Sequence, residues 1–228
     1  MSFPLSVIVP VLNEEKFLDA TLSRLAGEAD VEILLVDGGS TDRTTCIAGR
    51  YPVSVLRSER GRARQMNAGA ARAKGDILFF CHADTLVPAG YKKMIETALT
   101  GAKTVAGAFS LAIALDGLSI RLIEKLANRR SRKRQLPFGD QGLFLRADRF
   151  HNHGGFPDIP LLEDLSLVER LRNHGTIKII DHCVVSSGRR WDKNGVLLTS
   201  LLNQLILLGH RLGIAPARLA QIYQWLGR

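Results

Sequence analysis

Residues 76–84 read DILFFCHAD, a short apolar run that ends in a histidine and an aspartate. An unbroken apolar run of this length is typical of a strand that is buried on both faces of a parallel sheet. In open α/β sheets, ligands bind in the crevice outside the carboxyl ends of such strands. We therefore expect His82 and Asp84 to lie at the edge of the sheet where a ligand binds.

The segments before this run alternate between strands and helices. Apolar runs at residues 5–10 and 31–36 predict two further buried strands, and the run at 53–56 predicts a third strand. Asn13 is expected to cap a helix that runs to Leu25, and residues 61–73 predict a second helix. This alternation indicates an α/β fold with a Rossmann-like, mostly parallel central sheet flanked by helices.

The remainder of the chain continues with both kinds of element and shows no internal repeat or linker. The predicted helices cover residues 91–99, 118–128 and 164–172, and the predicted strands cover residues 105–115, 141–145 and 177–180. From Val196 onward the pattern indicates an amphipathic helical tail. We expect this tail to pack on the rest of the chain, to form a homodimer, or to contact a membrane peripherally.

The net charge of +9 points to anionic partners. Five of the six residues in the block 129–134 are basic, and the block is expected to be either a lid that orders over phosphates or a solvated loop. Binding to single-stranded nucleic acid calls for aromatic residues among the basic ones. The block has none and aromatic residues make up only 6% of the chain, so we expect no nucleic-acid partner.

Cysteine usage and hydropathy indicate the compartment. The three cysteines form no CxxC pair, which argues against a zinc ribbon or a disulfide framework and favours a reducing cytoplasm. We expect no signal peptide, and no segment reaches the roughly 18 apolar residues of a membrane span. The predicted location is therefore cytoplasmic, with the tail as a candidate for peripheral contact at the inner membrane face.

Several polar side chains follow the predicted strands. The first strand ends in PVLNEE, residues 10–15, without the glycine-rich turn of dinucleotide-binding folds. Asn13 and Glu14 could hydrogen-bond a base or ribose, or simply begin a helix. Asp37 ends the second strand, where it could accept hydrogen bonds from a ribose or stabilise the following turn.

Other residues suit phosphate chemistry. One of the arginines at 60, 62 and 64 is expected near a diphosphate, and Arg64 is our choice. Asp84 could hold Mg²⁺ or Mn²⁺, which neutralises a diphosphate leaving group. Glu163 and Asp164 open a predicted helix, where one could act as a general base or both could simply favour the helix dipole.

In their joint order, these motifs resemble the family 2 glycosyltransferases of the GT-A fold. The similar stretches are SVIVP with NEE at residues 6–15, VDGGSTDRT at 36–44, the triplet at 82–84, and ED at 163–164. The resemblance implies an inverting glycosyltransferase that moves a sugar from a nucleotide-sugar donor to an acceptor hydroxyl. It implies one catalytic domain over 1–228, with a nucleotide-binding half at 1–85, a metal and acceptor half at 86–192, and the helical tail at 193–228.

The resemblance also implies roles for single residues. Asp164 would be the catalytic base, and Asp84, with His82, would hold the metal. The residues implied around the nucleotide and its diphosphate are Pro10, Glu14, Asp37, Arg64, Arg190 and Trp191. The acceptor side would consist of Asp140, Gln141 and Glu163.

The chain departs from the family pattern at two positions. His82 stands where the family usually has the first aspartate of its metal motif, and Gly38 replaces a second aspartate after Asp37. An imidazole ligand would favour Mn²⁺ over Mg²⁺, or His82 could instead contact a ribose or a metal-bound water. Stretches at 137–142, 154–157 and 189–191 are similar to a small bacterial branch associated with arsenosugar biosynthesis. The alternative to an active glycosyltransferase is a catalytically inactive module that binds nucleotide sugars or other anions.

Overall fold

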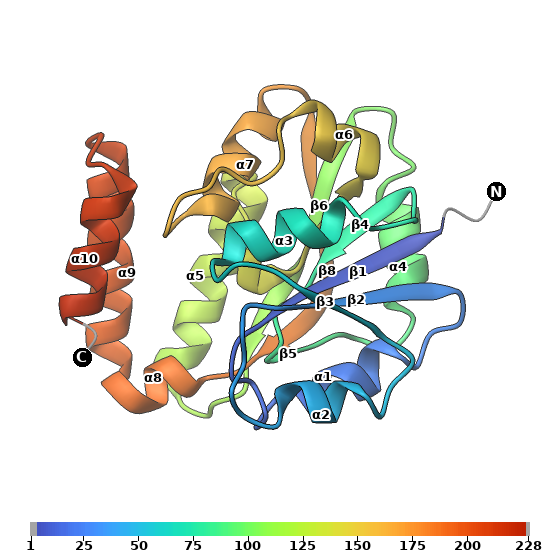
Figure 1. Ribbon diagram of the computed structural model, residues 1–228. Helices are drawn as coiled ribbons and strands as arrows, with labels where there is room; N and C mark the ends of the chain where they lie inside the picture. The colour runs from blue at the N-terminus through green and yellow to red at the C-terminus, as the bar shows by residue number, and fades with distance from the viewer. Residues whose placement is uncertain (1–3, 227–228) are drawn as a thin grey trace.

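The structure, a computed structural model that describes residues 4–226, is built on a mixed eight-stranded sheet (Figure 1). β1 (Leu5–Val11) pairs in parallel with β2 (Val31–Asp37) on one side and β4 (Ile77–Phe80) on the other. β3 (Ser54–Arg57) continues the parallel half beyond β2. The strands predicted over residues 5–84 are therefore confirmed, and their carboxyl ends lie at one edge.

The second half of the sheet is mixed. β7 (Leu143–Arg146) runs antiparallel to its neighbours β4 and β6 (Thr104–Ile113), and β8 (Thr176–Ser186) runs parallel to β6. The short β5 (Thr85–Leu86) pairs with the end of β8. The strand order is β3-β2-β1-β4-β7-β6-β8-β5. Because β5 directly follows β4 along the chain and pairs with the end of β8, the segments after β4 and β8 lie together.

Helices cover both faces of the sheet because successive side chains of each strand point to opposite faces. α1 (Leu18–Leu25), α2 (Thr44–Ala48) and α4 (Tyr91–Ala98) pack on the face that contains Val7 and Val9. α3 (Arg62–Ala70), α6 (Ala147–Asn152) and α7 (Glu163–Arg172) pack on the face that contains Ile8. The α/β fold with a helix-flanked sheet is thus confirmed.

Asn13 does not cap a helix. Its backbone has a φ of 57°, and α1 begins only at Leu18. The Asn13 Oδ1 atom instead accepts a hydrogen bond from the backbone N–H of Thr41 at 2.8 Å. Asn13 therefore ties the loop after β1 to the loop after β2, because asparagine tolerates the left-handed conformation that this contact needs.

The basic block at 129–134 is helical, so the expectation of a loop there was wrong. α5 runs from Leu118 to Arg134 and ends at Gln135, which adopts the left-handed conformation. Arginine and lysine are good helix formers, and positive charge near a helix carboxyl end is favoured by the helix dipole. Arg130 is further fixed by the ring of Phe138, which lies 3.7 Å from its guanidinium carbon.

The predicted helical tail consists of two longer helices that follow the short helix α8 (Arg189–Asn194). α9 (Val196–Arg211) and α10 (Pro216–Leu226) form a layer on the side of the molecule away from the N-terminus, next to α5 (Figure 1). Leu202, Ile206 and Leu219 are buried, which confirms that the tail packs on the chain. In residues 4–226, no helix has the length and apolar character that crossing a membrane requires. All three cysteines are free.

Candidate active site

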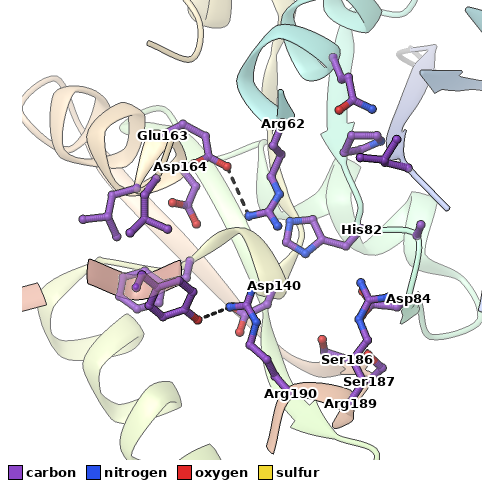
Figure 2. A pocket seen from close by; sticks show the side chains of 18 of the residues that line it. Arg62, His82, Asp84, Asp140, Glu163, Asp164, Ser186, Ser187, Arg189 and Arg190 are labelled. Atoms are coloured by element: carbon purple, nitrogen blue, oxygen red, sulfur yellow. Dashed lines mark hydrogen bonds and ion pairs between the residues drawn. The ribbon is translucent and has the colours of Figure 1, made fainter. Parts of the chain in front are cut away.

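A pocket of about 410 Å³ lies at the carboxyl ends of β1 and β4. It is large enough for a small organic ligand. Its walls come from the loops after these strands, from α3 and α7, and from the C-terminal helices (Figure 2). The predicted site residues that line it are Pro10, Glu14, His82, Asp84, Asp140, Glu163, Asp164, Arg190 and Trp191.

Gln65 shapes one end of this pocket. Its buried side-chain amide donates hydrogen bonds to the carbonyl oxygens of Val11 and Val36, both at 2.8 Å. These contacts hold the ends of β1 and β2 at a fixed separation beside Pro10 and Glu14. Asp37, predicted to contact the nucleotide, is buried and does not line the pocket. It accepts a hydrogen bond from the backbone N–H of Ser40, which is turn chemistry.

Arg189 joins two carboxylates across the pocket. It donates two hydrogen bonds to Glu14, at 2.7 and 2.9 Å, and its Nε atom lies 3.1 Å from Asp84 Oδ2. The Ser187 hydroxyl also donates to Asp84. The paired Glu14 carboxylate raises the pKa of the Arg189 guanidinium, which therefore stays positively charged. This residue was missed in the sequence, where its only signal is its place beside Arg190.

His82 and Asp164 approach each other around a glycine. A Cβ atom on Gly139 would lie 3.0 Å from Asp164 Oδ2 and 3.1 Å from His82 Nε2, so glycine allows both side chains into this space. Asp164 accepts hydrogen bonds from the backbone N–H groups of Gly139 and Leu165. Burial lowers the pKa of His82 to about 3, and the charge of Arg62 contributes. The imidazole is therefore neutral at pH 7.

Arg62, rather than Arg64, is the arginine of α3 that faces the pocket (Figure 2). Its Nη1 atom lies 3.4 Å from Oε1 of Glu163. Burial and the neighbouring charge of Asp164 raise the pKa of Glu163. Arg64 instead forms ion pairs with Glu59 and Asp158 and does not line the pocket.

Two buried polar atoms in the pocket wall have no hydrogen-bond partner in the described part of the chain. They are Oδ1 of Asp140 and Nε1 of Trp191, an acceptor and a donor. Buried polar groups are normally paired, so both atoms are positioned to bind polar groups of a ligand. Gln141, the neighbour of Asp140, is fully buried and bonds to Ser131 and to the carbonyl of Phe109. It supports the pocket from behind and does not line it.

We expect the Asp140→Asn variant to be more stable than the wild-type protein at pH 7.5 but not at pH 4. Burial raises the pKa of the Asp140 carboxyl to about 6 from an ordinary value of 3.8, although Arg130 opposes this. In the unfolded chain the Asp140 carboxyl ionises at a lower pH than in the folded protein. The free energy of unfolding of the wild-type protein therefore falls as the pH rises from about 4 to about 6. Asparagine cannot ionise, so the two proteins should differ in unfolding free energy at pH 7.5 by about 3 kcal/mol more than at pH 4.

Urea unfolding of both proteins at the two pH values measures this effect. The same difference in unfolding free energy at both pH values would contradict the assignment of a buried, ionising Asp140.

Asp84 and His82 are the side chains best suited to a divalent cation. One carboxylate and one neutral imidazole are ligand types that Mn²⁺ accepts. In residues 4–226, no group of three or more His, Cys, Asp or Glu side chains is arranged to hold a metal by itself. A cation at Asp84 would thus take further ligands from a bound diphosphate, as Mg²⁺ commonly does in phosphate-binding sites.

Comparison with known proteins gives the family and the fold. Residues 6–153 match the family described as Glycosyl transferase family 2. The chain is 31% identical to an undecaprenyl-phosphate 4-deoxy-4-formamido-L-arabinose transferase of Aeromonas hydrophila over 161 residues, which cover 64% of this chain and 49% of that protein. The chain spans about half or less of the length of the curated relatives it matches.

Solved structures confirm the GT-A fold. A mannosyltransferase of Pyrobaculum calidifontis, in complex with GDP-Man and Mn²⁺, superposes with a TM-score of 0.66 at 19% identity, covering 98% of this chain and 69% of that chain. Glucosyl-3-phosphoglycerate synthase of Mycobacterium tuberculosis, with Mg²⁺ and UDP, superposes with a TM-score of 0.64 at 18% identity, covering 93% and 80%. None of these names refers to arsenosugars, so that narrower resemblance stays a prediction.

Proposed function

Because the chain belongs to glycosyl transferase family 2, we propose that it moves a sugar from a nucleoside-diphosphate sugar to an acceptor hydroxyl in the pocket described above. The observation that carries the proposal is that one pocket joins two chemically different ends. Glu14, Asp84 and Arg189 form a charged end beside the sheet edge, and Asp164 lies on the other side of the pocket (Figure 2).

The donor would lie along the carboxyl edge of β1, with its base or ribose against Pro10 and Glu14. Its diphosphate would reach Asp84 and the guanidinium groups of Arg189 and Arg190, since arginine suits phosphate oxygens. The distant relatives described above bind UDP or GDP-Man, which supports a nucleotide donor for this chain.

A divalent cation fits the charged end, with Asp84 and His82 as its protein ligands. When bound there, a cation would neutralise the diphosphate as it leaves. The Asp84 carboxylate already pairs with Arg189, so it is a site that binds positive charge. Neutral His82 offers a ring nitrogen, and the neighbours' Mn²⁺ and Mg²⁺ support this proposal.

Transfer would be a single displacement with inversion. Asp164 would accept the proton of the acceptor hydroxyl, whose oxygen would form the new bond to the anomeric carbon. The bond between that carbon and the diphosphate would break, and the electron pair would leave with the nucleoside diphosphate. Asp140 and Glu163 would orient the acceptor from the pocket wall.

We further propose that the protein works in the cytoplasm, as its cysteine usage predicts.

Release of nucleoside diphosphate from a panel of UDP-, GDP- and ADP-sugars, with and without Mn²⁺, tests this function. Slow hydrolysis by water in place of the acceptor is expected for at least one donor. An inactive binding module would bind such a donor and release no nucleotide, so release separates the two candidates.

A further inference from the structure

The C-terminal helices carry an exposed leucine face. The exposed leucines are Leu197, Leu198, Leu201, Leu205 and Leu208 of α9, and Leu212 directly after its end. Most are spaced by three or four residues, which places them along one side of the helix. Leu197 is 85% exposed, and Trp225 of α10 is 75% exposed. Contiguous apolar surfaces of this kind mark sites that bind another protein or a membrane.

The opposite side of α9 contributes to the pocket. Asn203, Ile206 and Leu207 line the pocket, together with Tyr223 of α10. Arg190, which also lines it, donates a hydrogen bond to the hydroxyl of Tyr223. The two helices therefore form the pocket wall on one side and the exposed leucine face on the other.

The neighbouring helix α5 has a similar exposed stripe combined with positive charge. Leu118, Leu122 and Leu126 are exposed and spaced by four residues. Lys125, Arg129 and Lys133 are exposed and are also spaced by four residues. Lys125 and Arg129 lie three residues after Leu122 and Leu126, and Lys133 lies seven after Leu126, so they share that side of the helix. α5 and α9 lie side by side at one end of the molecule (Figure 1).

The positive charge around the exposed leucine face favours an anionic membrane over a second copy of the chain as its partner. Residues 193–226 contain no aspartate or glutamate, whereas Lys193, Arg211 and Arg218 are exposed. An interface between two copies of this chain would bring these like charges and those of α5 together. Leucine and tryptophan flanked by lysine and arginine suit the boundary of an anionic bilayer.

We propose that α9, α10 and α5 dock this protein on the surface of an anionic membrane. The leucine face would enter the boundary between headgroups and acyl chains, and the basic residues of α5 would contact the anionic headgroups. The pocket wall made by Asn203, Ile206 and Leu207 would then lie close to the membrane surface.

Flotation of the full chain with vesicles tests the proposal, and it needs no substrate, so its outcome is separate from that of the proposed function. We compare vesicles of phosphatidylcholine alone with an equal mixture of phosphatidylcholine and phosphatidylglycerol. We expect at least about tenfold tighter binding to the anionic vesicles, because lysine and arginine near the surface each add to affinity. Raising the salt concentration from about 0.1 M to about 1 M should weaken binding to the anionic vesicles, since salt screens the attraction between the basic residues and the headgroups.

Three variants make the test specific. The double variant Leu201→Glu with Leu208→Glu should lose binding to anionic vesicles by at least about tenfold, because it removes apolar area and adds negative charge. Lys125→Glu with Arg129→Glu should also lose binding to anionic vesicles. Because this variant keeps all the leucines, it still tests the proposal if the first variant folds poorly. Val55→Glu, at an exposed apolar position on β3, is the matched control and should bind like the wild-type protein.

Equal binding of wild-type protein and both double variants would overturn the proposal, as would equal binding to neutral and anionic vesicles. A wild-type dimer in light scattering that Leu201→Glu with Leu208→Glu dissociates, without vesicle binding, would assign the face to a second copy of the chain instead.

Discussion

The Asp164→Asn variant is expected to lose sugar transfer by about 10²- to 10⁴-fold, the usual contribution of a general base. Asparagine has nearly the same shape but cannot accept a proton from the acceptor. Asp164 lies at the start of α7, where the backbone N–H groups of Gly139 and Leu165 orient its carboxylate toward the space beside His82. The nucleotide would bind elsewhere, near Glu14, so its Kd should change by less than about twofold.

Initial rates of nucleotide release and calorimetric titration with the nucleoside diphosphate measure the two quantities separately. Glu163→Gln is the control, because it removes the adjacent carboxylate, which pairs with Arg62. It should reduce the rate by a smaller factor. Wild-type turnover in Asp164→Asn would show that another group takes the proton.

Substitutions of Asp84 and of Arg189 are expected to change the affinity of the ligand-free protein for Mn²⁺ in opposite directions. Asp84→Asn should weaken binding at least tenfold, because it removes the carboxylate ligand. Arg189→Ala should strengthen it by about tenfold, because the guanidinium 3.1 Å from Asp84 occupies the carboxylate and repels a cation. Without Arg189, the carboxylates of Glu14 and Asp84 would both be available to attract positive charge.

Electron paramagnetic resonance of free Mn²⁺ measures these affinities without any turnover. Arg190→Ala is the matched control, since Arg190 donates to Tyr223 and forms no ion pair with Asp84 in the described structure. It should leave the affinity nearly unchanged. If Arg189→Ala weakened Mn²⁺ binding, the competition between Arg189 and the cation would be refuted. Arg189→Ala should also weaken binding of the nucleoside diphosphate, because it removes a phosphate-binding group.

The sheet and one edge of the site were predictable because they follow local patterns. Apolar runs of four to six residues predicted the strands β1 to β4, and polar residues that follow these runs, such as Glu14 and Asp84, lie at the carboxyl edge. The pairing of Arg189 with Glu14 joins residues 175 positions apart. It depends on the path of β8 and on the loop that follows, which no local pattern specifies.

Two expectations differ from the structure for the same reason, which is that the charged residues were interpreted without the helix that contains them. Arg62 and Arg64 are two positions apart on α3, so they point in different directions and only one faces the pocket. The basic block at 129–134 was treated as a loop, but its residues also favour the carboxyl end of a helix, and α5 continues through it. Gln141 was placed at the acceptor because of its neighbours, whereas burial makes it a support.

Calorimetric titration of the ligand-free protein with UDP, GDP and ADP, with and without Mn²⁺, tests most directly whether the pocket is a nucleotide-sugar site. The account predicts saturable binding of at least one nucleotide at one site per chain, tighter with Mn²⁺ and weakened by Asp84→Asn. If none of the three nucleotides bound under either condition, the assignment of this pocket to glycosyl transfer would be contradicted.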